Sequence, residues 1–219
     1  MKLWLIRHGE TEWNHEKRFQ GQADIPLNDY GRELARWTRD GMPRVAWDRV
    51  FASPLGRAFE TAEILLDGLY PIDRIIRDRR LMEFNFGPHE GADITEAASN
   101  PAHPLYTCLH HPGDYHPTDG AESFESLVAR GREFLEQQIV PLESACDHVL
   151  IVAHGALLRS LMIAARIPGH SIANFWGAPY YNCCVSRLDL SGQQFTLDFE
   201  AKIYYNPEHA TRSWTPAET

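Results

Sequence analysis

Short apolar runs alternate with longer amphipathic stretches along most of the chain. The short runs are typical of strands, and HVLIVA at 148–153 has the continuous apolar character of a strand covered on both faces. Strands are predicted at residues 2–7, 49–52, 73–77 and 148–153. Helices are predicted from apolar spacing at residues 29–40, 54–69, 121–140 and 156–166.

Two helix starts carry local signals. Asn28 is a suitable cap for the helix at 29–40. Ser53 is a good N-cap and Pro54 a good first residue for the next helix, so that helix is expected to begin at 54.

The end of the chain has a different pattern. Runs at 183–190 and 195–203 flank a Ser-Gly-Gln turn and predict an antiparallel hairpin. With the alternation of strands and helices before it, the pattern predicts an α/β fold. We expect a three-layer sandwich, with a mostly parallel central sheet and helices on both faces. In such sheets ligands bind beyond the carboxyl ends of the strands.

Length and composition limit the number of domains and the class of protein. With 219 residues, 43% of them hydrophobic, the chain fits a single domain over 1–219. Residues 86–120 lack a clear period and are predicted to form an irregular lid or insert. No run approaches the roughly 18 apolar residues of a membrane helix, and no signal peptide is recognisable. The four cysteines form no C-x-x-C pair, so we expect reduced thiols in a cytoplasmic protein.

The net charge of −9 argues against nucleic-acid binding, which favours a basic face. It leaves room for an anionic small substrate, because a pocket can be basic while the surface is acidic. We therefore expect a small-molecule partner, with no nucleic acid and no membrane. An exposed edge strand in the last hairpin would also allow pairing in a homodimer.

Candidate chemistry collects at two strand ends. The first strand ends in Arg7-His8-Gly9, and the fourth is followed by His154-Gly155. One such histidine alone is more often structural than catalytic. Two at matching strand ends favour a site, and glycine allows a sharp turn and a close ligand approach.

Arg57 falls in the first turn of a predicted helix. A surface ion pair is the simplest interpretation, yet a cation is poorly placed at the positive end of a helix dipole unless an anion sits there too. Two arginines and two histidines that converge on one point would suit a dianion. Phosphate is the obvious candidate, because guanidinium groups match its oxygens.

Four segments carry a family resemblance: RHGETEWN, SPLGRAFETA, LMEFNFGPHEG and VAHGALLR. They resemble the signature segments of the histidine phosphatase superfamily, also called phosphoglycerate mutase-like. The pattern is nearest to small phosphatases such as the α-ribazole phosphatases.

The resemblance implies roles for individual residues. It makes His8 the nucleophile that becomes phosphohistidine, and Glu83 the proton donor and acceptor. It also implies a phosphate pocket of Arg7, Arg57 and His154, assisted by Asn14 and the Gly155 backbone. Gln20 and Gly21 are expected to face the substrate end of that pocket.

Protonation and charge follow from these roles. A neutral imidazole is a competent nucleophile near pH 7. Glu83 should be protonated when substrate is bound, which apolar neighbours such as Leu81, Phe84 and Phe86 would favour. Two arginines offset the charge on the phosphate oxygens, so no metal and no cofactor are expected.

The insert is rich in histidine. The cluster of His103, Cys108, His110, His111, Asp114 and His116 invites a metal-site interpretation. Its spacing matches no standard zinc pattern, and prolines interrupt it. A lid that touches the substrate is the preferred hypothesis, and the role of 103–116 stays open.

The superfamily contains mutases and phosphatases. Residues 92–120 hold no arginine or lysine, whereas phosphoglycerate mutases carry paired arginines in their insert. The segment TDGAESFESLVAR is similar to the GES segment of the smaller phosphatases. We therefore predict a phosphatase acting on a bulky or weakly charged leaving group. The alternatives are a cofactor-dependent phosphoglycerate mutase, which is an isomerase, and a non-catalytic phosphate-binding module.

Overall fold

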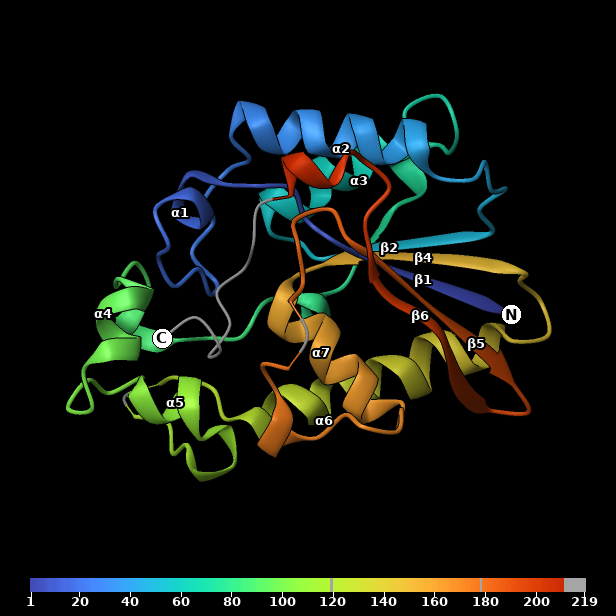
Figure 1. The fold of residues 1–219 in the computed structure, drawn as a ribbon. Helices are drawn as coiled ribbons and strands as arrows, with labels where there is room; N and C mark the ends of the chain where they lie inside the picture. The colour runs from blue at the N-terminus through green and yellow to red at the C-terminus, as the bar shows by residue number, and fades with distance from the viewer. Residues whose placement is uncertain (119, 178, 211–219) are drawn as a thin grey trace.

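A six-stranded sheet forms the centre of the computed structural model, which describes residues 1–118, 120–177 and 179–210 (Figure 1). Residue 119 of the predicted insert and residues 211–219 of the predicted domain lie outside the described residues. The strands are Lys2–Arg7 (β1), Arg49–Ala52 (β2), Ile76–Arg77 (β3), His148–Ala153 (β4), Val185–Ser191 (β5) and Gln194–Lys202 (β6).

The strand order is β3-β2-β4-β1-β5-β6. The first four strands in this order pair in parallel, whereas β5 and β6 are antiparallel to their neighbours. The predicted mostly parallel sheet is therefore confirmed, as is the terminal hairpin. Its two-residue turn is Gly192-Gln193, and both residues have positive φ, as a type I′ turn requires.

Helices cover both faces of the sheet. They are Glu12–His15 (α1), Asp29–Gly41 (α2), Gly56–Leu66 (α3), Ile94–Ser99 (α4), Tyr106–His110 (α5), Phe124–Phe134 (α6) and Gly155–Ala164 (α7). In Figure 1, α2 and α3 lie above the sheet, and α6 and α7 lie below it. Within the described part of the chain, no helix has both the length and the apolar character needed to cross a membrane.

The central strand β1 explains why both faces are covered. Leu3 and Leu5 belong to the apolar cluster that includes α6 and α7, while Trp4 and Ile6 belong to the cluster that includes α3. Successive side chains of a strand point to opposite faces, so a continuously apolar strand needs a partner layer on each side. Each of the four is at most 1% exposed.

Three predicted elements need correction. Residues 73–77 form only the short edge strand β3, because Ile72–Arg74 make a 3-10 turn first. The helix predicted at 121–140 begins at Phe124, capped by the Ser123 side chain, and becomes a π-helix at Leu135–Ile139. The helix predicted at 54–69 spans only Gly56–Leu66.

Ser53 is not the cap of α3, contrary to the prediction. The N-cap residue is Leu55, which makes no side-chain capping bond. The Ser53 hydroxyl is instead hydrogen-bonded to His154, as described below. Asn28 does cap α2, where its side chain accepts a hydrogen bond from the Gly31 N–H at 2.7 Å.

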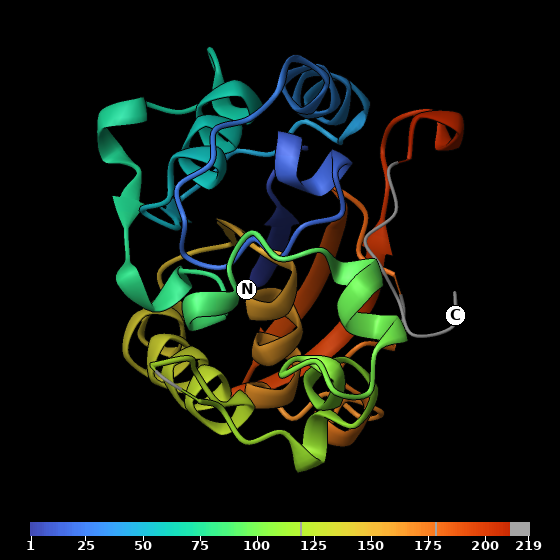
Figure 2. The same ribbon diagram turned by 90° about the vertical axis from the view of Figure 1, so that its left-hand side faces the viewer.

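The insert at 86–120 contains regular structure, namely the short helices α4 and α5. It lies beyond the carboxyl ends of the parallel strands, together with α1, and Figure 2 looks onto this end of the molecule. Leu105, Cys108 and Leu109 are buried in the main apolar cluster, so α5 is packed onto the core. The Trp176 indole donates to the Cys108 carbonyl at 2.8 Å and ties the segment around 176 to α5.

Candidate active site

The two histidines predicted at matching strand ends lie side by side. Arg7 is opposite Ala153 in the parallel pair β1–β4, and the His8 N–H donates to the Ala153 carbonyl at 2.9 Å. The next residues in each chain segment are His8 and His154, whose ring centroids are 5.1 Å apart. Strand pairing alone therefore brings the two imidazoles to one edge of the sheet.

The His8 imidazole has one defined tautomer. Its Nδ1 atom lies 2.6 Å from the Gly9 carbonyl oxygen, and a carbonyl can only accept, so Nδ1 carries the proton. The Nε2 atom then presents a lone pair. Burial lowers the pKa of His8 well below its ordinary value, and the nearby Arg57 and Arg7 lower it further. His8 is therefore a neutral imidazole at pH 7, as a nucleophile must be.

His154 is oriented by Ser53. Its Nε2 atom lies 2.7 Å from the Ser53 hydroxyl, and its Nδ1 atom is buried without a partner among the described residues. Burial, followed by Arg57 and His8, lowers the pKa of His154 well below its ordinary value. When the Ser53 hydroxyl donates to Nε2, the proton of the neutral ring sits on Nδ1 and can be donated to a ligand. The sequence analysis missed this role of Ser53.

Backbone carbonyls hold the two predicted arginines. Arg7 donates from Nη1 to the Tyr180 carbonyl, and Arg57 donates to the carbonyls of Ala23 at 2.8 Å and Gly21 at 2.7 Å. Burial lowers the pKa of Arg57 to about 10, so it stays charged at neutral pH. Gly21 acts through its backbone here, and a Cβ at Gly21 would lie 2.1 Å from a Glu90 carboxylate oxygen.

Gln20 and Asn14 line the same pocket as His8. The Thr11 hydroxyl donates to Gln20 Oε1 at 2.7 Å, which leaves the Gln20 Nε2 amide as the group available for a ligand. Asn14 Oδ1 accepts from the Asn182 side-chain amide at 3.2 Å. Asn182 also donates to the His8 carbonyl at 3.1 Å, and this supporting residue was not predicted.

Four buried nitrogen atoms in these side chains have no hydrogen-bond partner among the residues that the structure describes. They are Arg7 Nε, Gln20 Nε2, Arg57 Nε and His154 Nδ1. Buried polar groups are rarely left unsatisfied, so such a group of donors calls for an acceptor. Two of the donors belong to guanidinium groups, which favour a multivalent oxyanion.

Glu83 lies at the amino end of α7. One carboxylate oxygen accepts from the N–H groups of Phe84 at 2.9 Å and Leu157 at 3.0 Å, and the other accepts from Ala156 at 3.2 Å. These N–H groups hold the Glu83 carboxyl group at the pocket, and its protonation when substrate is bound stays a prediction.

Arg130 fixes the backbone of the Glu83 segment and was not predicted. It donates to the carbonyls of Arg80, Met82 and Glu83 at 2.6–2.9 Å. Glu122 receives two further hydrogen bonds from Arg130, at 2.7 and 2.9 Å. The Glu122 of the GES-like segment therefore positions Glu83 through Arg130.

The pocket in front of His8 has a volume of about 100 Å³. Its lining includes the predicted residues Arg7, His8, Asn14, Gln20, Glu83 and Gly155. Its remaining walls are Arg18, Phe19, Phe86, Ile94, Leu109, Ala156, Arg159, Trp176 and Tyr180. The insert contributes apolar side chains to this wall, and none of its histidines is among the lining residues. Among the described residues, no three His, Cys, Asp or Glu side chains form a group that could hold a metal ion.

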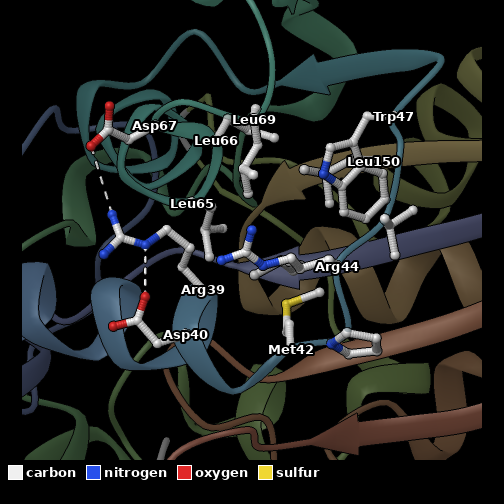
Figure 3. A pocket seen from close by; sticks show the side chains of 13 residues that line it. Arg39, Asp40, Met42, Arg44, Trp47, Leu65, Leu66, Asp67, Leu69 and Leu150 are labelled. Carbon is white, nitrogen blue, oxygen red and sulfur yellow. Dashed lines mark hydrogen bonds and ion pairs between the residues drawn. The ribbon is translucent and has the colours of Figure 1, made fainter.

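A larger hollow of about 440 Å³ lies between the carboxyl ends of α2 and α3 (Figure 3). Apolar side chains such as Met42, Trp47 and Leu65 line it, and Arg39 is ion-paired there with Asp40. No predicted site residue lines this hollow. The smaller pocket is therefore the candidate active site, on the ground of its chemistry rather than its size.

Known proteins share this fold and most of this chain's length. The adenosylcobalamin/alpha-ribazole phosphatase of Salmonella typhimurium is 30% identical over 95% of this chain and 100% of its own. The 2,3-bisphosphoglycerate-dependent phosphoglycerate mutase of Cytophaga hutchinsonii is 31% identical, with coverages of 88% and 92%. The solved structure of Bacillus stearothermophilus YhfR matches with a TM-score of 0.81 and 33% identity, and the match covers 92% of this chain and 97% of YhfR.

The family model of the histidine phosphatase superfamily, branch 1, matches residues 3–201. That span includes both strand-end histidines, Arg57 and Glu83. The chain belongs to the histidine phosphatase superfamily.

Proposed function

We propose that this protein hydrolyses phosphomonoesters of small molecules through a phosphohistidine intermediate on His8. The observation that carries the proposal is the group of four buried donors beside a neutral His8 imidazole. Phosphatase relatives support hydrolysis of phosphoric monoesters as the reaction class.

In the first step, the His8 Nε2 lone pair attacks phosphorus. A P–N bond forms as the bond from phosphorus to the ester oxygen breaks in line. Arg7, Arg57, Gln20 and His154 hold the three remaining phosphoryl oxygens, because phosphoryl transfer depends mainly on positioning and charge stabilisation. The leaving oxygen takes its proton from Glu83.

On this mechanism Glu83 carries a proton when substrate is bound. The dianionic phosphate provides the reason: a second negative charge nearby disfavours the ionised carboxylate. In the second step, Glu83 takes a proton from water, the water oxygen attacks phosphorus, and the P–N bond breaks. Inorganic phosphate leaves, and His8 is again neutral.

A mutase would pass the phosphoryl group from His8 to a second hydroxyl instead of water. The residues of the insert that line the pocket favour water as the acceptor of the phosphoryl group. They are Phe86, Ile94 and Leu109, which offer no charged group to a second phosphorylated substrate. A purely binding module would not need the fixed tautomer of His8 or a carboxylate at Glu83.

The test is phosphate release from p-nitrophenyl phosphate, with and without EDTA. Wild-type protein should hydrolyse the ester equally in both conditions, and His8→Ala should lose at least 10³-fold in kcat, as expected when a nucleophile is removed. His15→Ala is the matched control, because His15 is exposed at the end of α1.

Rapid quenching and mass spectrometry should find the phosphoryl group on a peptide containing His8. Transfer from 2,3-bisphosphoglycerate to phosphoglycerate faster than hydrolysis would instead establish a mutase. Tight phosphate binding without turnover would establish a binding module.

A further inference from the structure

Glu90 lies near the start of the insert, directly after the 3-10 turn Gly87–His89, and has no part in the proposed mechanism. Its carboxylate binds two successive backbone N–H groups of residues 20–24, called here the 20–24 loop. One oxygen accepts from the Gln22 N–H at 2.7 Å, and the other accepts from the Ala23 N–H at 2.6 Å. Such charge-assisted hydrogen bonds are roughly twice as strong as those between neutral groups. Glu90 therefore fixes the backbone of this loop.

The 20–24 loop in turn holds the Arg57 side chain. Arg57 Nη1 donates to the Ala23 carbonyl at 2.8 Å, and Nη2 donates to the Gly21 carbonyl at 2.7 Å. Both terminal nitrogens of the guanidinium group are thus bound to the loop, while the buried Nε atom has no partner among the described residues. Because a guanidinium group is planar, the two carbonyls determine the direction in which Nε points.

A single peptide group connects Glu90 to Arg57. The Gly21 carbonyl and the Gln22 N–H belong to the same planar unit, so Arg57 binds its oxygen and Glu90 binds its hydrogen. Hydrogen bonds in such a chain polarise and strengthen one another. The two charges also attract: burial lowers the pKa of Arg57, and Glu90 is among the carboxylates that raise it. A shift of the Glu90 carboxylate would therefore be passed on to Arg57.

The 20–24 loop is packed closely against Glu90 and against the Glu83 segment. A Cβ at Gly21 would lie 2.1 Å from a Glu90 carboxylate oxygen and 2.7 Å from the Phe84 carbonyl oxygen. The Gln22 side-chain amide donates to the Glu83 carbonyl at 3.1 Å. The absence of a side chain at Gly21 thus permits the approach that lets one carboxylate reach both N–H groups.

We propose that Glu90 is a positioning residue, which places the Arg57 guanidinium at the phosphate group through the backbone of the 20–24 loop. The inference rests on the role that the proposed function gives to Arg57 as a phosphate ligand. A hydrogen bond that only stabilises the loop would contribute to folding, whereas a positioning residue also changes how tightly phosphate is bound.

Binding of inorganic phosphate, measured by titration calorimetry, tests the proposal. Glu90→Gln keeps one acceptor oxygen but turns an NH2 group toward a backbone N–H, so the loop loses a hydrogen bond. We expect phosphate to bind about 3- to 30-fold more weakly than to wild type. Glu90→Asp keeps the charge but shortens the reach, and it should also weaken phosphate binding. Glu96→Gln is the control, because Glu96 is exposed on α4 of the same insert.

A double-mutant cycle with Arg57 separates positioning from a general effect on structure. In an Arg57→Ala background, Glu90→Gln should weaken phosphate binding by less than about twofold, because the group that it positions is absent. The value of kcat/KM for p-nitrophenyl phosphate should show the same lack of additivity. If Glu90→Gln does not fold, Glu90→Asp takes its place in the cycle.

Two results would overturn the role of Glu90. Unchanged or tighter phosphate binding in Glu90→Gln is one, because removal of a negative charge alone favours an anion. An equal loss with and without Arg57 is the other, because it indicates a structural role. Either result, with p-nitrophenyl phosphate still hydrolysed by wild type, leaves the phosphatase intact. Phosphate binding with the expected coupling, but no hydrolysis of any ester, would overturn the phosphatase and uphold the role of Glu90.

Discussion

At the scale of residues, the site depends on which ring nitrogen carries the proton in each of the two neutral histidines, His8 and His154. The Gly9 carbonyl fixes the proton of His8 on Nδ1, whereas the Ser53 hydroxyl places the proton of His154 on Nδ1 when it donates to Nε2. The two bonds leave opposite functions exposed: a lone pair on His8 and an N–H donor on His154. The proposed mechanism therefore assigns one residue type to two roles, the nucleophile and a phosphate ligand, at 5.1 Å between the ring centroids.

Removing the Ser53 hydroxyl should weaken the second of these functions. In Ser53→Ala, His154 can adopt either tautomer, so only part of the population presents its proton to the phosphoryl group. We expect kcat to fall about two- to tenfold, the worth of one hydrogen bond of about 0.5–1.5 kcal/mol, with KM for p-nitrophenyl phosphate nearly unchanged.

Steady-state kinetics of Ser53→Ala beside Ser126→Ala would measure this, since Ser126 is exposed on α6. An unchanged kcat would mean that Ser53 does not select the tautomer of His154.

At the scale of elements, the loop after His8 is clamped against the start of α2. The Asn28 N–H donates to the Glu10 carbonyl at 3.0 Å, and the Asn28 side chain donates to the Glu10 carboxylate at 2.9 Å. A Cβ at Gly31 would lie 2.1 Å from the Glu10 carbonyl oxygen, and one at Gly9 would lie 2.5 Å from the Gly31 carbonyl oxygen. Glycine at these two positions permits backbone-to-backbone packing beside the nucleophile.

Gly31→Ala should therefore destabilise the protein, although alanine favours a helix by about 1 kcal/mol. The new methyl group meets backbone atoms, which cannot rotate away, and we expect a net loss of about 1–3 kcal/mol of unfolding free energy. Urea unfolding would measure it. Gly113→Ala is the control, because the nearest atoms to its Cβ are 3.9 Å away. Equal stability of the two variants would argue against the clamp.

The burial of each strand decides whether the sequence could predict it. The strands at 2–7, 49–52 and 148–153 match the prediction because both of their faces are covered, which leaves a continuous apolar run in the sequence. Strand β3 was misjudged, since Ile76 and Arg77 at the sheet edge are exposed and carry no such signal.

The site was predictable where a reactive side chain directly follows a predicted strand, as His8 and His154 do. It was not predictable where a contact joins distant segments. Ser53 and His154 are 101 positions apart, and Glu83 lies 73 positions before its α7 partner Ala156. Arg159 was not singled out, although it ends the segment VAHGALLR, because only the packing of α7 shows that its side chain is buried and lines the pocket.

At the scale of the whole molecule, the two buried histidines couple stability to pH. Both pKa values are lowered below the unfolded value of 6.5, so below pH 6.5 the unfolded chain binds protons that the folded chain does not. This contribution to stability is complete above pH 6.5 and is lost as the pH falls toward the lowered values. At pH 5.5 the loss is on the order of 1 kcal/mol for each histidine.

Urea unfolding at pH 7.5 and 5.5 in phosphate-free buffer would reveal this loss. The fall in unfolding free energy should be smaller in His8→Gln than in wild type, by on the order of 1 kcal/mol. His15→Gln, at an exposed position, should behave as wild type. An identical fall in all three proteins would mean that His8 takes up its proton in the folded state.

The hydrogen bond from Trp176 to the Cys108 carbonyl has a consequence for how the pocket can be rebuilt. The proposed phosphate-binding residues Arg7, Arg57 and His154 lie at or after the ends of β1, β2 and β4, whereas the insert and the segment around Trp176 form other walls of the pocket. The two segments also meet at the Phe124 ring, whose centroid is 5.8 Å from that of Tyr115 in the insert and 6.0 Å from that of Trp176. A chimera that imports another family member's insert is therefore expected to need that member's segment around Trp176 as well. We expect the insert and the segment around Trp176 to be exchangeable only as a pair, with the strand-end residues left unchanged.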